Sequence, residues 1–197
     1  QSYTDWEMLI SDDASTDDSV KSMRDYVFST KNGQTKLTII ENRENVGFSS
    51  TVNRGVREAK GEIVVLLNTD VAPEKDFLQP LVAHFEEDPN LFAVGCMDKS
   101  IEAEKIVLRG RGLGNWQRGL LVHRRGEVEK TNTLWVSGGS SGVRKSIWDK
   151  LGGFNELYNP FYWEDIDLSY RALKSGYKIR FEPKSIVFHE HEKGAII

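Results

Sequence analysis

The amino-acid sequence predicts a single α/β domain in which helices cover both faces of a mostly parallel central sheet. Short apolar runs alternate with segments whose apolar residues fall on one helical stripe. The connections between them are short, an order that favours parallel strands joined by crossover helices. With 197 residues, 39% of them hydrophobic, the chain is also long enough to bury one sizeable core.

The first half of the chain supplies most of this pattern. Apolar runs predict strands at 6–11, 36–41, 62–68 and 92–97. Helices are predicted after the acidic loop that follows the first strand, at about 49–59, and at 77–88. The run at 62–68 is the strongest strand signal, and its continuous apolar character is typical of a strand covered by helices on both faces. We therefore expect this strand to be central.

The alternation stops after residue 98. Residues 100–133 are rich in charge and glycine, with a hairpin predicted around 120–123. A strand is expected at 134–137, ending in the Gly- and Ser-rich stretch 138–142. Helices at 145–151 and 164–175, then strands at 177–181 and 185–189, complete the chain. No internal repeat or linker interrupts it.

Composition excludes several classes of function. The net charge of −4 and the absence of a basic run argue against a nucleic-acid partner. The single cysteine, Cys96, lies in an apolar run, so no disulfide framework is expected and a reducing compartment fits. No apolar stretch approaches the roughly 20 residues that span a bilayer, so the sequence predicts a soluble chain.

Two acidic segments directly follow predicted strands. In an open α/β sheet, ligands bind beyond the carboxyl ends of the strands. Asp12 and Asp13 follow the first strand, and they either contact a ligand or cap the next helix. Asp70, preceded by Asn68, follows the strand at 62–68. A carboxylate there can hold a divalent cation together with substrate phosphates, or it can cap a turn.

A third acidic segment lies at the start of the predicted helix 164–175. Glu164 and Asp165 occupy its first turn, while apolar positions further along form a stripe that packs on the body. The helix dipole favours the ionised acids, whereas their mutual repulsion opposes full ionisation. A carboxylate that accepts a proton is one interpretation, and ordinary first-turn acids are the other.

The order of these segments carries a family resemblance. Its motifs run along nearly the whole chain: residues 12–17 (DDASTD), 42–48 (NRENVGF), 53–55 (NRG), 61–62 (GE), 67–70 (LNTD), 152–156 (GGFNE) and 163–168 (WEDIDL), followed by Arg171 and Gly176. Together they resemble the inverting family 2 glycosyltransferases, which have the GT-A fold. The bacterial rhamnosyltransferase-like branch is the most similar.

The resemblance implies a metal-assisted inverting hexosyltransferase. Its donor would be a nucleotide-diphosphate sugar and its acceptor a glycan or lipid-linked molecule, in polysaccharide or cell-envelope biosynthesis. Mn²⁺ or Mg²⁺ is the implied cofactor. A cytoplasmic location is implied, at the inner face of the membrane if the full-length protein associates with it peripherally.

The resemblance also assigns roles to the acids. Asp165 matches the catalytic base, with Glu164 as its neighbour. Asp12 and Asp13 would contact the nucleotide base and ribose, with Asp13 favoured. Transfer with inversion needs a base for the acceptor hydroxyl and a cation that neutralises the leaving diphosphate, so the two must come from different segments.

The metal contacts come from the remaining motif and the end of the chain. Asp70 would bind the cation that bridges the diphosphate, with Asn68 beside it as a further cofactor contact. His189 matches a position that supplies another metal or phosphate contact, for which His191 competes. Asn68 departs from the family pattern, where an acid is frequent, and this predicts a lower metal affinity.

We expect residues 1–197 to form one N-terminally truncated GT-A domain, with a nucleotide-binding half at 1–98 and an acceptor and catalytic half at 99–197. The family's first strand is absent, so a sheet edge is either exposed or refilled. A non-catalytic domain that binds a sugar nucleotide or a glycan is the alternative function. A nucleotidyltransferase is disfavoured because residues 12–19 contain no glycine for a phosphate loop.

Overall fold

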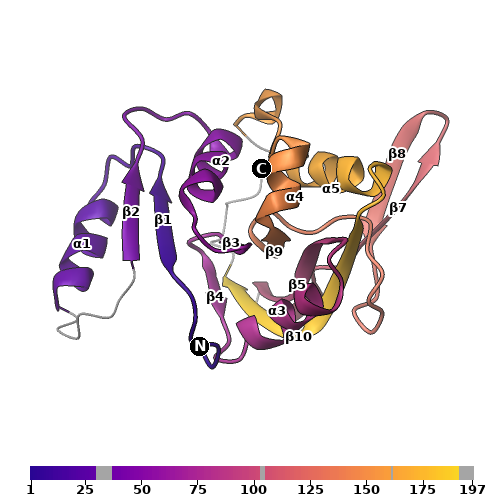
Figure 1. Cartoon of the computed structure of the whole chain (residues 1–197), viewed down its shortest axis with the longest axis horizontal. Coiled ribbons are helices and arrows are strands. Elements are labelled where there is room, and N and C mark those ends of the chain that lie inside the picture. The colour runs from indigo at the N-terminus through magenta and orange to yellow at the C-terminus, as the bar shows by residue number, and fades with distance from the viewer. Residues whose placement is uncertain (30–36, 103–104, 161, 191–197) are drawn as a thin grey trace.

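The computed structural model describes residues 1–29, 37–102, 105–160 and 162–190 (Figure 1). Most of the predicted helices and strands are present near their expected bounds. In chain order the elements are β1 (Met8–Asp12), α1 (Ser19–Ser29), β2 (Leu37–Glu41), α2 (Phe48–Glu58), β3 (Ile63–Leu67), β4 (Val71–Pro73), α3 (Leu78–Glu87), β5 (Leu91–Glu102), β6 (Lys105–Arg109), β7 (Gly112–Gln117), β8 (Leu120–Arg125), β9 (Ser140–Arg144), α4 (Lys145–Leu151), the 3₁₀ turn η1 (Glu156–Tyr158), α5 (Glu164–Lys174) and β10 (Lys178–Glu190).

The sheets are mixed, so the prediction of a mostly parallel sheet is wrong. The main sheet has the order β3-β9-β5-β10-β4, with β6 paired to the end of β5. Only β5 and β10 are parallel neighbours in it, while β9 runs antiparallel to both β3 and β5. β1 and β2 form a separate parallel pair. The physical reason is that β9, from late in the chain, inserts between β3 and β5. The predicted pattern of crossover helices would have made β3 and β5 direct neighbours.

This insertion also corrects the position expected for the strand at 62–68. β3 ends the main sheet in the part of the chain that the structure describes, and β5 holds the centre. The apolar character of β3 still reflects burial on two faces, because Leu66 and Val65 pack into different hydrophobic clusters. Two covered faces therefore do not require two strand neighbours.

The strand predicted at 134–137 lies instead at β9. Ser141 and Gly142 are buried in β9, and a Cβ on Gly142 would lie 2.4 Å from Cδ2 of Leu81. Small residues are needed here because α3 packs closely against this strand. Ser and Gly have low strand propensity, so the local sequence points to a turn where the tertiary packing requires a strand.

Helices cover both faces of the main sheet, as predicted. On one face, α2, α4 and α5 enclose a cluster that contains Val56, Trp148 and Leu168. On the other face, α3 contributes Phe77, Leu81 and Phe85 to a second cluster. Strands from 1–98 and from 99–197 contribute to the same sheet.

Two further elements refine the predictions for the second half. The hairpin expected around 120–123 is confirmed as the pair β7 and β8, which extends away from the main sheet (Figure 1). The two strands predicted at 177–181 and 185–189 are one strand, β10. Its pairing with β5 shifts register between Glu182 and Ile186, where Pro183 interrupts the ladder.

β1 and β3 each leave one edge without a strand. β1 pairs with β2 and β3 pairs with β9, and the described residues supply no strand for the other edge of either. Met8 on β1 and Leu67 on β3 are 45% and 41% exposed. Within the described ranges, no helix is long and apolar enough to cross a membrane.

Candidate active site

Asp165 lies in the first turn of α5, beside the loop that precedes β9. Its Oδ2 accepts a long hydrogen bond of 3.4 Å from the amide of Gly138, and its Oδ1 accepts one of 2.7 Å from the amide of Ile166. Burial raises the pKa of Asp165 above its usual value, although these N–H groups and the nearby charge of His123 oppose the rise. Asp165 is thus held in place while remaining a stronger base than an ordinary aspartate.

Glu164 is buried beside Asp165. Its side chain is 5% exposed, and Oε2 is buried with no hydrogen-bond partner among the described residues. Desolvation raises the pKa of Glu164, and the neighbouring charge of Asp165 adds to the rise. The first turn of α5 therefore contains two acids whose ionisation is opposed by burial. We call Glu164 and Asp165 the Asp165 station.

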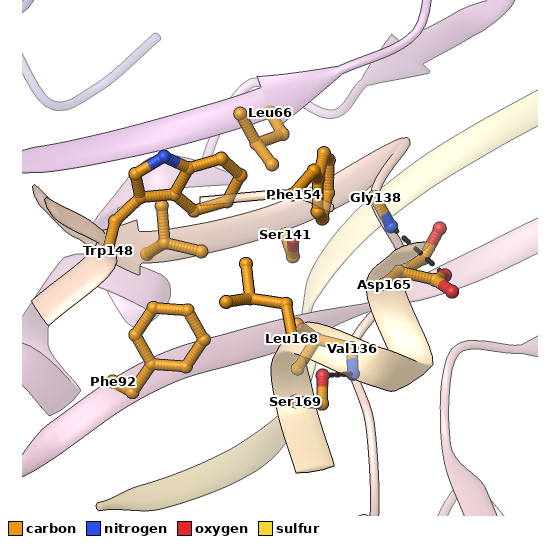
Figure 2. A pocket seen from close by; sticks show the side chains of 12 residues that line it. Leu66, Phe92, Val136, Gly138, Ser141, Trp148, Phe154, Asp165, Leu168 and Ser169 are labelled. Carbon is orange, nitrogen blue, oxygen red and sulfur yellow. Dashed lines mark hydrogen bonds between the residues drawn. The ribbon is translucent and has the colours of Figure 1, made fainter. Parts of the chain in front are cut away.

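An apolar cavity of about 10 Å³ lies beneath Asp165, lined mainly by side chains of the first hydrophobic cluster. Figure 2 shows the Asp165 carboxylate at the edge of this cluster, with the amide of Gly138 beside it and Trp148, Phe92 and Leu168 further inside. This volume holds at most one water molecule. The apolar side chains that line this cavity adjoin Asp165, and the cavity is too small to be a substrate site.

Asp70 and His189 lie together at the carboxyl end of β3. Nε2 of His189, on β10, is 3.0 Å from Oδ2 of Asp70. Nδ1 of the same ring is 3.2 Å from Oδ2 of Asp98, at the end of the apolar part of β5. The Asp70 side chain is 53% exposed, whereas those of His189 and Asp98 are only 18% and 14% exposed. We call Asn68, Asp70 and His189 the Asp70 station; His191 lies outside the described residues.

The donor chemistry of the Asp70 station fits a divalent cation. A neutral imidazole has one N–H and one lone pair, so His189 cannot donate to the carboxylates of both Asp70 and Asp98. Either a second ring proton or a cation held by Nε2 and Asp70 removes this conflict. The described residues contain no group of three or more metal-binding side chains. Two protein ligands are enough where substrate phosphates and waters complete the shell, as is usual for Mg²⁺.

Asp12 ends β1 and Asp13 directly follows it, and both carboxylates accept hydrogen bonds from backbone amides. Oδ2 of the buried Asp12 accepts from the amide of Ser15 at 3.1 Å. Asp13 accepts from the amides of Val46 and Gly47, each at 2.9 Å, and from the side chain of Asn42. Burial acts to raise the pKa of Asp13, but these hydrogen bonds outweigh it and the pKa is lowered. Asp13 thus fixes the loop before α2, and a nucleotide contact at this Asp13 station remains a prediction.

Short loops link the three stations. The amide of Asn68 donates to the carbonyl of Gly139 at 3.0 Å, and the next residue back, Gly138, donates to Asp165. The Asp70 and Asp165 stations are therefore joined through two consecutive glycines. A Cβ on Gly139 would lie 2.6 Å from Nδ2 of Asn68, so this contact depends on the absence of a side chain.

The Asp13 station is linked to the segment before α5 in a similar way. Asn159 accepts from the amide of Ser49 at 3.1 Å and donates to the carbonyl of Val46 at 2.9 Å. The amide of Phe48 donates to the carbonyl of Pro160. The loop that Asp13 anchors therefore packs against the chain that leads into Glu164 and Asp165.

Backbone strain is concentrated beside two of the stations. Among the described residues, three that are not glycine have positive φ: Ala14 at 61°, Arg118 at 50° and Trp163 at 78°. Ala14 directly follows Asp13, and Trp163 directly precedes Glu164. Such conformations cost about 1–3 kcal/mol each and persist where the surrounding structure enforces them, which is frequent at functional sites.

Aromatic rings surround the Asp165 station on the side of the hairpin. The ring of His123, on β8, makes edge contacts with Trp135 at 5.4 Å and with Trp163 at 5.1 Å. Trp116 on β7 contacts Tyr170 of α5 at 5.5 Å. Trp116 and Trp163 remain 55% and 44% exposed, so their free faces can stack on the apolar face of a sugar.

Two residues beside the site, Asp98 and Asn159, were not expected from the sequence. Asp98 carries a signal similar to that of Asp70, because it is an acid that directly follows an apolar run. Asn159 acts through contacts with Val46 and Ser49, which no local pattern reveals. Asp98 could thus have been found from the sequence, and Asn159 could not.

The chain also matches a known protein family. Residues 1–152 match the sequence profile described as Glycosyl transferase family 2. The match covers more than half of the chain, so the chain belongs to this family. The bacterial rhamnosyltransferase-like branch is one of several distant likenesses.

Curated relatives include several kinds of glycosyltransferase. The pre-mycofactocin glycosyltransferase of Mycobacterium tuberculosis is 26% identical over 156 residues, which cover 79% of this chain and 32% of the relative. The O-antigen chain rhamnosyltransferase RfbN of Salmonella typhimurium is 24% identical over 159 residues, covering 77% of this chain and 49% of the relative. The chain thus spans about a third to a half of these relatives.

Solved structures show the same fold. The crystal structure of GalNAc-T7 with UDP, GalNAc and Mn²⁺ matches with a TM-score of 0.76 and 20% sequence identity, covering 94% of this chain and 38% of that chain. The protein therefore has the GT-A fold.

Proposed function

We propose that this domain transfers a sugar from a nucleotide-diphosphate donor to an acceptor hydroxyl with inversion at the anomeric carbon. The observation that carries the proposal is the link through Gly138 and Gly139, which joins a raised-pKa carboxylate, Asp165, to the acid and imidazole pair of Asp70 and His189. Inverting transfer needs a base and a charge-neutralising group that come from different segments, and this loop joins two such segments.

Asp165 acts as the general base in this proposal. The acceptor oxygen forms a bond to the anomeric carbon while the bond from that carbon to the diphosphate oxygen breaks. The electron pair of the broken bond leaves with the diphosphate, and the acceptor proton passes to Asp165. Burial raises the pKa of Asp165, which increases its proton affinity, and a positioned base of this kind contributes about 10²–10⁴-fold to the rate. Glu164 lies buried beside it in the first turn of the same helix, as its neighbour in the proposed catalytic pair.

Asp70 and His189 would hold Mn²⁺ or Mg²⁺, with Asn68 beside them. The cation, when bound, neutralises the charge on the leaving diphosphate. Asn68 adds no charge, and its backbone amide instead ties the station to Gly139. The structure of GalNAc-T7 was determined with UDP and Mn²⁺, which supports a nucleotide and metal requirement of this type. Asp12 and Asp13 would then form the nucleotide side of the site.

The acceptor approaches from the side of the β7–β8 hairpin in this proposal. The exposed Trp163 and Trp116 offer faces for a sugar ring, which favours a glycan or lipid-linked acceptor. The name of the Salmonella relative supports a role in polysaccharide or cell-envelope biosynthesis, with a rhamnosyl-like hexosyl donor. We place this activity in the cytoplasm, where peripheral association of the full-length protein would bring it to the inner face of the membrane.

A donor screen followed by product analysis tests the proposal. UDP-, GDP- and dTDP-sugars are added with and without MnCl₂, and thermal unfolding is recorded. A ligand present at about 100 times its Kd stabilises the native state by about 2.7 kcal/mol, so we expect a clear rise in Tm for the true donor. NMR of the product should then show the opposite anomeric configuration. Retention of configuration would contradict the assignment of a single base.

The second candidate function is a non-catalytic domain that binds a sugar nucleotide or a glycan. It is favoured by Asn68, which lacks the charge of an acid, and by the edges of β1 and β3 that no strand covers among the described residues. Hydrolysis of a donor by the purified domain, dependent on Asp165, would rule this candidate out.

A further inference from the structure

We propose that Asp98 is a positioning residue that orients His189 as a metal ligand. The inference rests on the proposed function, because it concerns the cation held by Asp70 and His189. It adds a residue that lies behind the metal-binding atoms and touches neither the cation nor the donor.

The position of Asp98 in the sheet brings its side chain to His189. β5 and β10 are parallel, and their register pairs His189 with Ser100 and Val187 with Asp98. Asp98 and Ser100 are two residues apart, so their side chains leave β5 on the same face as His189. Oδ2 of Asp98 then reaches Nδ1 of His189 at 3.2 Å, on the opposite side of the ring from Asp70.

The side chain of Asp98 is itself held in place. Its Oδ1 accepts a hydrogen bond of 3.0 Å from the hydroxyl of Ser100, which is fully buried. One carboxylate oxygen is thereby occupied, and the other faces the imidazole. Ser100, Asp98 and His189 form a chain of contacts that leads from the sheet to Asp70.

The consequence concerns the tautomer of the ring. When Nδ1 carries the proton and donates it to Asp98, the lone pair of Nε2 faces Asp70. Metal-binding histidines commonly have this arrangement, in which a carboxylate accepts the second ring N–H and fixes the ring orientation. The other tautomer would place a proton where the cation belongs.

Direct metal binding by Asp98 is disfavoured by the same contacts. Its two oxygens face Ser100 and Nδ1 of His189, and the side chain is only 14% exposed. A purely structural ion pair is the remaining reading. It predicts that loss of Asp98 changes stability and leaves metal affinity unchanged.

Manganese binding measured without turnover distinguishes these readings. Free Mn²⁺ is counted by electron paramagnetic resonance during titration of the full chain with MnCl₂, in the presence of UDP or GDP. We expect Asp98→Ala to bind Mn²⁺ about 10–100-fold more weakly than the wild type. Asp98→Asn should fall between them, because an amide oxygen can still accept the ring N–H without the charge. Asp88→Ala, which removes a partly buried acid paired with Lys178, is the matched control and should bind as the wild type does.

The ring nitrogens give a readout that stability alone does not affect. ¹⁵N NMR of the wild type loaded with MgCl₂ and UDP or GDP should show the proton of His189 on Nδ1. A proton on Nε2 would overturn the inference even if the alanine variant failed to fold. Equal Mn²⁺ affinity for Asp98→Ala and wild type would overturn it while leaving the proposed function intact. Absence of Mn²⁺ binding by the wild type with either nucleotide would overturn both.

Discussion

Neutralising Glu164 should stabilise the protein at neutral pH. Oε2 of Glu164 is buried without a hydrogen-bond partner among the described residues, a situation that costs about 1–3 kcal/mol for a neutral group, such as a Gln amide, and more for the ionised carboxylate. The helix dipole at the N-terminus of α5 offsets about 0.3–1 kcal/mol of this cost. Glu164→Gln should therefore raise the free energy of unfolding by about 1–2 kcal/mol near pH 8.

The stabilising effect of Glu164→Gln should depend on pH. Burial raises the folded-state pKa of Glu164 above its ordinary value of 4.5, so the wild type loses stability as pH rises through the raised pKa. Below 4.5 the group is protonated in both the folded and the unfolded state. The advantage of Glu164→Gln should thus be largest at neutral pH and should disappear in acid.

Urea unfolding of both proteins near pH 8 and near pH 4 measures this difference. Glu86→Gln, at an exposed position on α3, is the control and should change stability by less than about 0.5 kcal/mol. A Glu164→Gln variant that is less stable than the wild type near pH 8, or that keeps its advantage in acid, would refute the reasoning.

The remaining predictions concern the base, the core and the loop before α5. The kcat/KM of the wild type should rise with pH through the raised pKa of Asp165 and then level off; a profile flat down to pH 4 would contradict this. Gly142→Ala places a Cβ 2.4 Å from Leu81 and should lower the free energy of unfolding by about 1–3 kcal/mol, measured by urea unfolding. An unchanged urea midpoint would show that α3 can move away from β9. The guanidinium of Arg171 donates to Asp167 and to the carbonyls of Leu151 and Gly153, so Arg171→Lys should lower the free energy of unfolding by about 1–3 kcal/mol. Wild-type stability of this variant would mean that a lysine ammonium can replace these guanidinium hydrogen bonds.

The helices were the most predictable part of the fold. α4 was expected at 145–151 and has those bounds, because its apolar stripe and the glycines after it are local signals. The strand order was not predictable in the same way. β9 consists of Ser140–Arg144 and lies between β3 and β5, where Gly142 fits against Leu81, a contact between residues far apart in sequence.

The candidate site shows the same division. Asp70 and Asp165 lie at local patterns, the end of an apolar strand and the start of an amphipathic helix, that leave a capping role open. The family resemblance assigns their roles. The pairing of His189 with Asp70 also follows from that resemblance, and the structure places the two side chains in contact. The connection of Asp70 and His189 to Asp165 through Gly138 and Gly139 depends on a loop conformation that the local sequence does not determine.

A comparison of turnover with donor binding tests the role of Asp165 most directly. Asp165→Asn is compared with Asp167→Asn, an acid in the same helical turn that pairs with Arg171 at 2.8 Å. With the donor identified by the screen and Mn²⁺ present, Asp165→Asn should bind the donor as the wild type does and lose about 10²–10⁴-fold in kcat, while Asp167→Asn retains turnover. Normal turnover by Asp165→Asn, at wild-type donor affinity, would contradict the assignment of Asp165 as the base.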